Sequence, residues 1–127
     1  EIELCRGYLE IQKVRFGAAL IYDIQVPKVI QQTHGLPIFT LQLLAENAIK
    51  HNAFSKKNPL QLTIQYIEEG MIFVSNNILP KRQMEASIGF GLKNLEERFQ
   101  LLGSSIPRIE KSADTPTFSV YLPILKL

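Results

Sequence analysis

Apolar side chains recur along the chain at two spacings, one helical and one extended. In residues 2–16 they return every three to four positions, which predicts a helix that ends at Gly17. Residues 19–26 alternate between apolar and polar, which predicts a strand ended by Pro27. Residues 27–37 contain two prolines, one glycine and several polar side chains, so we expect mostly loop there.

Helical spacing returns at residues 40–51, for which Pro37 or Thr40 is a suitable start. The side chains of this segment divide between two opposite arcs of a helical wheel. The apolar arc holds Leu41, Leu44, Ala45, Ala48 and Ile49, and the polar arc holds Glu46, Asn47, Lys50 and His51. We therefore expect the apolar arc to pack on a core.

An antiparallel hairpin is predicted next. Residues 60–66 and 71–75 both favour strands, and a Glu-Glu-Gly turn joins them. Residues 76–90 then show no period, and loops of that length in compact domains are usually functional or mobile.

The last third of the chain predicts one helix and two strands. The helix runs from Gly91 to about Leu102 and is ended by Gly103, and the strands cover 106–110 and 117–123. One face of the helix holds Leu92, Leu95, Phe99 and Leu102, and one face of the last strand holds Phe118, Val120 and Leu122. Strands that can pair as hairpins, with helices gathered on one face, predict an α/β two-layer sandwich.

Composition and charge narrow the classes of function. A chain of 127 residues suits one domain, and its net charge of +2 is too weak to indicate binding to nucleic acid or to a membrane. The single cysteine, Cys5, excludes an internal disulfide framework and lies on an apolar helix face, where we expect it to be buried. The chain begins at Glu1 without a methionine, so we expect it to be a piece of a longer protein.

The polar arc of residues 40–51 admits two interpretations. It is either a solvated helix face or a site for a magnesium nucleotide. The amide oxygen of Asn47 suits Mg²⁺, which prefers oxygen ligands and keeps several waters. Lys50, one turn later, is a point charge suited to phosphate, and Glu46 could polarise a water or hold the hydration shell of the metal.

Gly89-Phe90-Gly91 precedes the predicted third helix and also admits two interpretations. It is either a simple turn or a place where backbone amides approach an anion at a helix N-terminus, with Lys93 and Asn94 in the first turn. It is neither a P-loop nor the dinucleotide-binding fingerprint, because the remaining residues of those motifs are missing.

Three stretches, in order along almost the whole chain, resemble LytS-type sensor histidine kinases. The first, YLEIQKVRFG, resembles the segment that joins their phosphoacceptor region to their ATPase domain. The second, LPIFTLQLLAENAIKHN, resembles their N-box. The third, IGFGLKNLEERFQLL, resembles their glycine box and the helix that follows it. These kinases belong to the GHKL, or Bergerat-fold, superfamily. The resemblance implies that residues 18–127 form a C-terminal ATP-binding catalytic domain with a mixed, mostly antiparallel sheet. Residues 1–17 would be the end of a helix leading to a dimerisation and phosphoacceptor region outside this chain.

The resemblance also assigns roles to the N-box residues. Asn47 matches the Mg²⁺ ligand, and Glu46 matches its acidic neighbour, which acts through metal-bound water. Lys50 matches the basic residue near the phosphates of ATP, and His51 matches the residue that closes the box.

The second half of the implied ATP site comes from the glycine box and the loop before it. The matching residues are Gly89, Phe90 and Gly91, followed by Leu92, Lys93 and Asn94 at the start of the helix. A lid would cover residues 78–90.

The adenine site departs from the pattern of the family, which has Asp-x-Gly after the second hairpin strand. Here Asn76 matches the Asp and Ile78 matches the Gly, with Asn77 between them. An Asn oxygen can still accept a hydrogen bond from the adenine amino group if the amide is suitably oriented, but it lacks charge assistance. Outside the family context, Asn76-Asn77 could simply be a turn.

The resemblance implies a histidine kinase that passes the γ-phosphoryl group of ATP to a histidine and then to a response regulator. We expect the acceptor to lie upstream, in a homodimeric parent, so neither His34 nor His51 should be phosphorylated. The domain itself would be cytoplasmic without membrane contact, and the parent would be membrane-anchored. Two alternatives remain: a dimerisation or signalling module with weakened nucleotide binding, and an ATPase of the gyrase or chaperone branch. Leu43 opposes the latter, because that branch has a water-activating Glu at this position.

Overall fold

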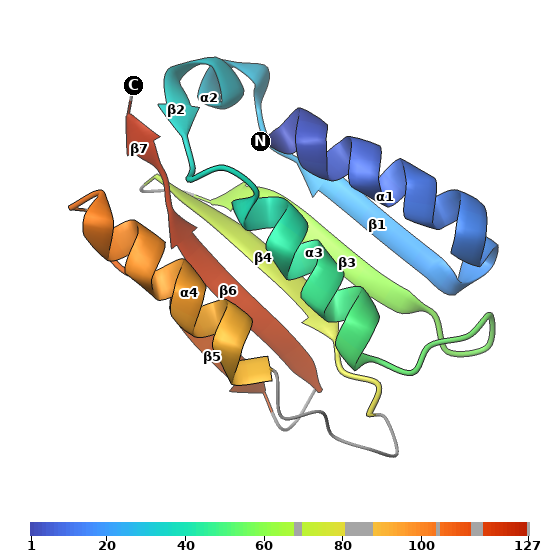
Figure 1. The fold of residues 1–127 in the computed structure, drawn as a ribbon. Coiled ribbons are helices and arrows are strands. Elements are labelled where there is room, and N and C mark those ends of the chain that lie inside the picture. The colour runs from blue at the N-terminus through green and yellow to red at the C-terminus, as the bar shows by residue number, and fades with distance from the viewer. Residues whose placement is uncertain (68–69, 81–87, 104, 113–115, 127) are drawn as a thin grey trace.

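The chain folds into two layers, a five-stranded sheet and three long helices that cover one of its faces (Figure 1). This computed structural model describes residues 1–67, 70–80, 88–103, 105–112 and 116–126, and only the backbone of 88–91. The helices are α1 (Ile2–Phe16), the 3₁₀ turn η1 (Gly17–Ala19), α2 (Lys28–Thr33), α3 (Thr40–His51) and α4 (Ile88–Leu101). The strands are β1 (Leu20–Gln25), β2 (His34–Gly35), β3 (Leu60–Ile67), β4 (Met71–Asn77), β5 (Arg108–Ser112), β6 (Thr117–Pro123) and β7 (Leu125–Lys126).

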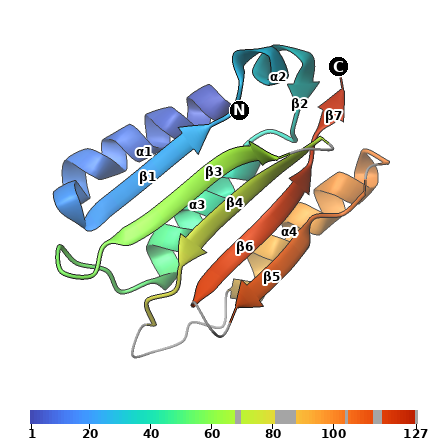
Figure 2. The same cartoon turned by 180° about the vertical axis from the view of Figure 1, so that it is seen from behind.

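The large sheet is mixed and mostly antiparallel. Its strand order is β1-β3-β4-β6-β5; β1 pairs with β3 in parallel, and the other neighbours are antiparallel. Seen from behind, the opposite face of the sheet carries none of the three long helices (Figure 2). The predicted α/β two-layer sandwich is therefore confirmed.

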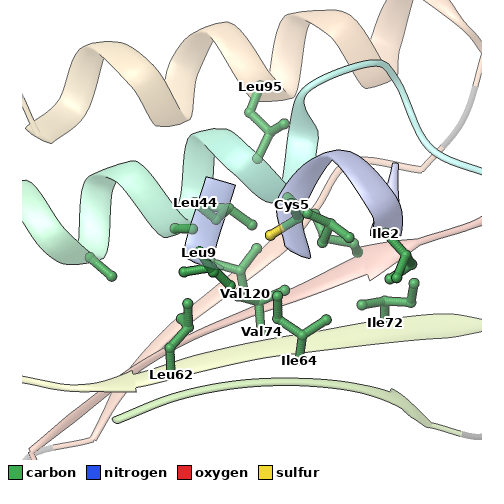
Figure 3. Close-up of a cluster of buried hydrophobic side chains, with 14 of the residues drawn as sticks. Ile2, Cys5, Leu9, Leu44, Leu62, Ile64, Ile72, Val74, Leu95 and Val120 are labelled. Carbon is green, nitrogen blue, oxygen red and sulfur yellow. The ribbon is translucent and has the colours of Figure 1, made fainter. Parts of the chain in front are cut away.

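The core lies between the sheet and the helices (Figure 3). Alternate residues of the strands point toward the helices, as the period of two requires. The side chains that meet there include Cys5 and Leu9 of α1, Leu44 of α3, Leu95 of α4, and Leu62, Ile64, Val74 and Val120 of the sheet. Helix α1, which we expected to lead toward another region, thus contributes buried side chains to this core.

The expected loop at residues 27–37 is wrong in part. The segment contains the helix α2 and the short strand β2, which pairs with β7 (Leu125–Lys126). No residue of the six-residue helix α2 is buried, so it has no apolar stripe that a periodic pattern could reveal. Strand β7 was not predicted either, because two residues are too few to show an alternation.

Helix α4 begins at Ile88, three residues earlier than predicted. Gly89 and Gly91 therefore lie within its first turn rather than ahead of it. At the other end, Gly103 adopts a left-handed φ of 70°, as expected for a residue that ends a helix. Leu102 lies beyond the last helical residue and is 54% exposed, so its predicted inward position is wrong.

Candidate functional site

A pocket opens at the edge of the sandwich where α3 ends, β4 ends and β6 begins. Its empty volume is about 550 Å³, a figure that includes space open to solvent. The lining residues are Leu44, Asn47, Ala48, His51, Asn52, Asn76, Ile78, Leu92, Lys111 and Phe118. Five of these residues are apolar, and the other five carry polar groups that can orient a ligand.

Helix α3 carries one wall of the pocket. Asn47 and Ala48 lie three and four residues after Leu44, and His51 lies four and three residues after them, so the four side chains share one face of the helix. The structure thus brings two predicted site residues, Asn47 and His51, to the border of the buried face. Lys50 is exposed on the neighbouring side of the helix.

Glu46 lies outside this pocket. Its Oε1 accepts a hydrogen bond from Nε2 of Gln42 at 3.0 Å, and it lines a separate shallow hollow with Arg98. Burial raises the pKa of Tyr8 on α1, and the negative charge of Glu46 raises it further. Glu46 therefore lies on a different side of α3 from Asn47 and His51, and the expected polar arc is divided between two sides of the helix.

Asn76 occupies the inward face of β4 at the floor of the pocket. The residue is 7% exposed, and its Nδ2 donates to the backbone carbonyl of Asn77 at 2.9 Å. A carbonyl oxygen only accepts hydrogen bonds, so it fixes the amide nitrogen on that side. The Oδ1 atom of Asn76 is therefore the acceptor left on the other end of the amide.

Asn77 points to the other face of the sheet. Its Oδ1 accepts from the backbone N–H of Gln61 at 2.8 Å, and its Nδ2 donates to the carbonyl of Pro59 at 3.0 Å. These bonds join the end of β4 to the start of β3. The structure does not bring Asn77 into the pocket with Asn76.

The first turn of α4 stands beside the pocket. Leu92 lines it, whereas Lys93 and Asn94 are exposed. The backbone N–H groups of a first helical turn have no intrahelical acceptors, and Gly89 and Gly91 lie in this turn. Of the predicted lid at 78–90, residues 81–87 lie outside the described residues, as does the side chain of Phe90.

The lining residues that the sequence analysis missed as site residues include Asn52, Phe118 and Lys111. Asn52 directly follows the N-box helix, and its type, a polar residue at a helix end, was the available signal. The alternation of the last strand had placed Phe118 inward, but nothing linked it to a ligand. Lys111 comes from β5, and no local pattern marks it.

Membrane-spanning helices and metal-binding clusters were sought among the described residues. No helix in these parts of the chain has the length and apolar character needed to cross a membrane. Within the same ranges, no three side chains of the His, Cys, Asp and Glu types gather as a metal cluster.

The sandwich with its end pocket has the fold of a histidine kinase domain. A solved structure of the mycobacterial sensor histidine kinase MprB superimposes with a TM-score of 0.58 and covers 99% of this chain and 95% of that one. At 15% sequence identity, this likeness shows the fold alone.

Sequence relatives identify the family. Sensor histidine kinase BtsS of Escherichia coli K12 is 35% identical over 106 residues, which is 78% of this chain and 19% of that protein. Sensor protein LytS of Streptococcus agalactiae serotype V is 29% identical over 125 residues, which is 85% of this chain and 21% of that protein. No protein-family model matches the chain. The chain belongs to the LytS-type sensor histidine kinases and spans about a fifth of the length of these relatives.

Proposed function

We propose that the chain is the ATP-binding catalytic domain of a two-component sensor histidine kinase. The observation that carries this proposal is the shared pocket: Asn47 and His51 of α3 line it together with the buried Asn76, beside the first turn of α4. In this proposal the domain transfers the γ-phosphoryl group of ATP to a histidine outside these 127 residues, and a response regulator then receives it.

The adenine end of the pocket would be at Asn76. Its Oδ1 is oriented as an acceptor, which suits the exocyclic amino group of adenine. Leu44, Ile78 and Phe118 supply the apolar walls that a flat aromatic base requires. The orientation of the amide thus meets the condition under which Asn can replace the Asp of the family.

The phosphate end would lie toward the first turn of α4. Its free N–H groups and its positive dipole end favour phosphate oxygens, and Lys50 and Lys93 add positive charge. Lysines hold phosphates as point charges, and transfer depends mostly on such positioning and charge neutralisation. Lys93 and Asn94 lie in the second turn of α4 and not in the first turn, which the sequence had predicted, because the helix begins at Ile88.

The donor set fits Mg²⁺ held with a single protein ligand. Asn47 offers one neutral oxygen at the pocket, which suits an ion that prefers oxygen ligands and keeps waters. When bound, Mg²⁺ would neutralise charge on the phosphates. Because Glu46 lies outside the pocket, we propose that it acts on the metal only through bound water.

The alternative function is a signalling or dimerisation module with weakened nucleotide binding, supported by Asn76 and Ile78 in place of Asp and Gly. A titration followed by backbone NMR, with a nonhydrolysable ATP analogue and Mg²⁺, separates the two. We expect shifts concentrated at Asn47, His51, Asn76 and Ile78. A folded chain that shows no shifts at millimolar ligand would favour the alternative.

The acceptor histidine is tested separately. His34 lies in β2 with its Nδ1 2.8 Å from Oγ1 of Thr33, at the opposite end of the sandwich from the pocket, and His51 is part of the pocket wall. Incubation of the chain with ATP should therefore label neither histidine. A phosphorylated His34 or His51, found by mass spectrometry, would contradict this part of the proposal.

A further inference from the structure

Asn52, the residue after α3, joins that helix to the chain segment leaving β4. Its Nδ2 donates to the carbonyl oxygen of Ala48 at 2.8 Å, and its Oδ1 accepts from the backbone N–H of Leu79 at 2.7 Å. Asn52 is 7% exposed; its bond to Ala48 is buried and its bond to Leu79 is partly buried. A single amide therefore satisfies a carbonyl of the last helical turn and an N–H of a different segment.

The segment that Asn52 holds is bonded on both sides. The N–H of Ala53 donates to the carbonyl of Leu79 at 2.8 Å, and the N–H of Ile78 donates to the carbonyl of Pro116 at 2.7 Å, just before β6. Leu79 is thus tied to the end of α3, while Ile78 is tied to the other side of the pocket. Ile78 itself lines the pocket.

The two hydrogen-bond partners require an amide. Ala48 presents an acceptor and Leu79 presents a donor, so the side chain between them must both donate and accept. Aspartate would keep the bond to Leu79 but would turn a negatively charged oxygen toward the Ala48 carbonyl. Alanine would leave both backbone groups unpaired in a buried place, which is costly.

We propose that Asn52 is a positioning residue of the nucleotide pocket. It sets the distance between the wall formed by α3 and the floor formed by Asn76 and Ile78, and it holds the point from which the chain continues toward α4. It acts through Leu79 and need not touch the nucleotide. This inference rests on the proposed ATP-binding function and adds a residue to its site.

The first test compares Asn52→Ala with the wild type by hydrogen exchange, without nucleotide. We expect the Leu79 amide to exchange at least about tenfold faster in the variant, because its acceptor is lost. Asn52→Asp keeps the acceptor and should keep most of this protection. Unchanged exchange at Leu79 in Asn52→Ala would overturn the inference whether or not the chain binds nucleotide.

The second test measures the affinity for a nonhydrolysable ATP analogue with Mg²⁺, at a temperature where circular dichroism shows each variant folded. Asn52→Ala should bind about tenfold more weakly, and Asn52→Asp should lie between it and the wild type. The matched control Asn58→Ala changes an exposed asparagine in the turn after α3 and should bind like the wild type.

The outcomes separate the inference from the function on which it rests. If the wild type fails to bind, the proposed function fails, and the exchange at Leu79 still decides whether Asn52 holds the segment. If the wild type binds and Asn52→Ala binds equally well, the positioning role is wrong. Should Asn52→Ala not fold, Asn52→Asp carries the affinity measurement, and wild-type affinity in that variant would overturn the positioning role.

Discussion

The carboxylate of Glu1 caps the N-terminus of α3, and its Oε1 accepts a hydrogen bond from the N–H of Leu41, 40 residues away, at 2.9 Å. Its Oε2 accepts a second bond from the N–H of Phe39 at 2.8 Å. Phe39 adopts a left-handed φ of 64° and provides no side-chain cap of its own. Glu1 thus links the start of α1 to the start of the helix that carries Asn47, with the charge that a helix N-terminus favours.

Removing this cap should destabilise the fold. We expect Glu1→Ala to lower the free energy of unfolding by about 1–2 kcal/mol, measured by urea denaturation, because two backbone N–H groups lose a charged acceptor. Glu3→Ala, which changes an exposed glutamate in the first turn of α1, is the matched control and should cost less than about 0.5 kcal/mol. Equal losses in the two variants would contradict the capping role.

The contribution of α4 to the stability of the fold should come from its buried face alone. Phe99 is fully buried, whereas Leu101 on the same helix is 87% exposed. Phe99→Ala should therefore lower the free energy of unfolding by about 3–5 kcal/mol, and Leu101→Ala by less than about 0.5 kcal/mol. The two variants, compared by urea denaturation, test how α4 lies on the sheet. A large cost at Leu101 with a small one at Phe99 is incompatible with the described packing.

Cys5 should make stability fall at high pH. Burial raises the pKa of its thiol from 9.0 to about 12, with a smaller contribution from the charge of Glu1. Above pH 9 the unfolded state then loses a proton that the folded state keeps, so stability decreases as the pH rises toward 12. Between pH 7 and pH 10 the wild type should lose about 1.4 kcal/mol more than Cys5→Ala in urea denaturation. Parallel pH profiles of the two proteins would show that the thiol ionises equally easily in both states.

Asn76 should select adenine over guanine. Its Oδ1 can accept from the amino group of adenine, whereas guanine presents a carbonyl oxygen at the same place, and two acceptors repel. We expect the wild type to bind an ATP analogue at least about tenfold more tightly than the matching GTP analogue, measured by calorimetry. Asn76→Leu should remove most of this preference.

The control for the base selectivity is Asn77→Ala. That side chain bonds to Pro59 and Gln61, away from the pocket, so its loss should lower stability and leave the preference for adenine unchanged. If the wild type binds both nucleotides with equal affinity, Asn76 does not discriminate between adenine and guanine.

Long elements with one buried face were predictable from the sequence. Helices α1 and α3 have the predicted bounds, because each repeats its apolar residues over at least three turns. The short strands β2 and β7 were not predictable, since their pairing joins residues about 90 positions apart, and the short helix α2 has no buried side chain to create a periodic pattern. The start of α4 was placed too late because the two glycines of its first turn resemble a helix boundary.

The candidate site was predictable only where a motif lies on one element. Asn47 and His51 came from a single helix, and the structure places both at the pocket. Lys111 belongs to the site through the pairing of distant strands, which no local pattern encodes, whereas the only signal for Asn52 was a polar residue at the end of α3. Glu46 faces Tyr8 of α1 and not the pocket, because of how α3 packs against α1. A helical wheel alone could not predict this orientation.

The central claim is that this pocket binds a magnesium nucleotide through Asn47. Isothermal calorimetry of the chain with a nonhydrolysable ATP analogue, with Mg²⁺ and with EDTA, tests it most directly. We expect binding that weakens at least about tenfold without Mg²⁺, and Asn47→Ala should lose this dependence while Asn58→Ala keeps it. No heat of binding from the folded wild type at millimolar analogue, or equal Mg²⁺ dependence in Asn47→Ala, would contradict the claim.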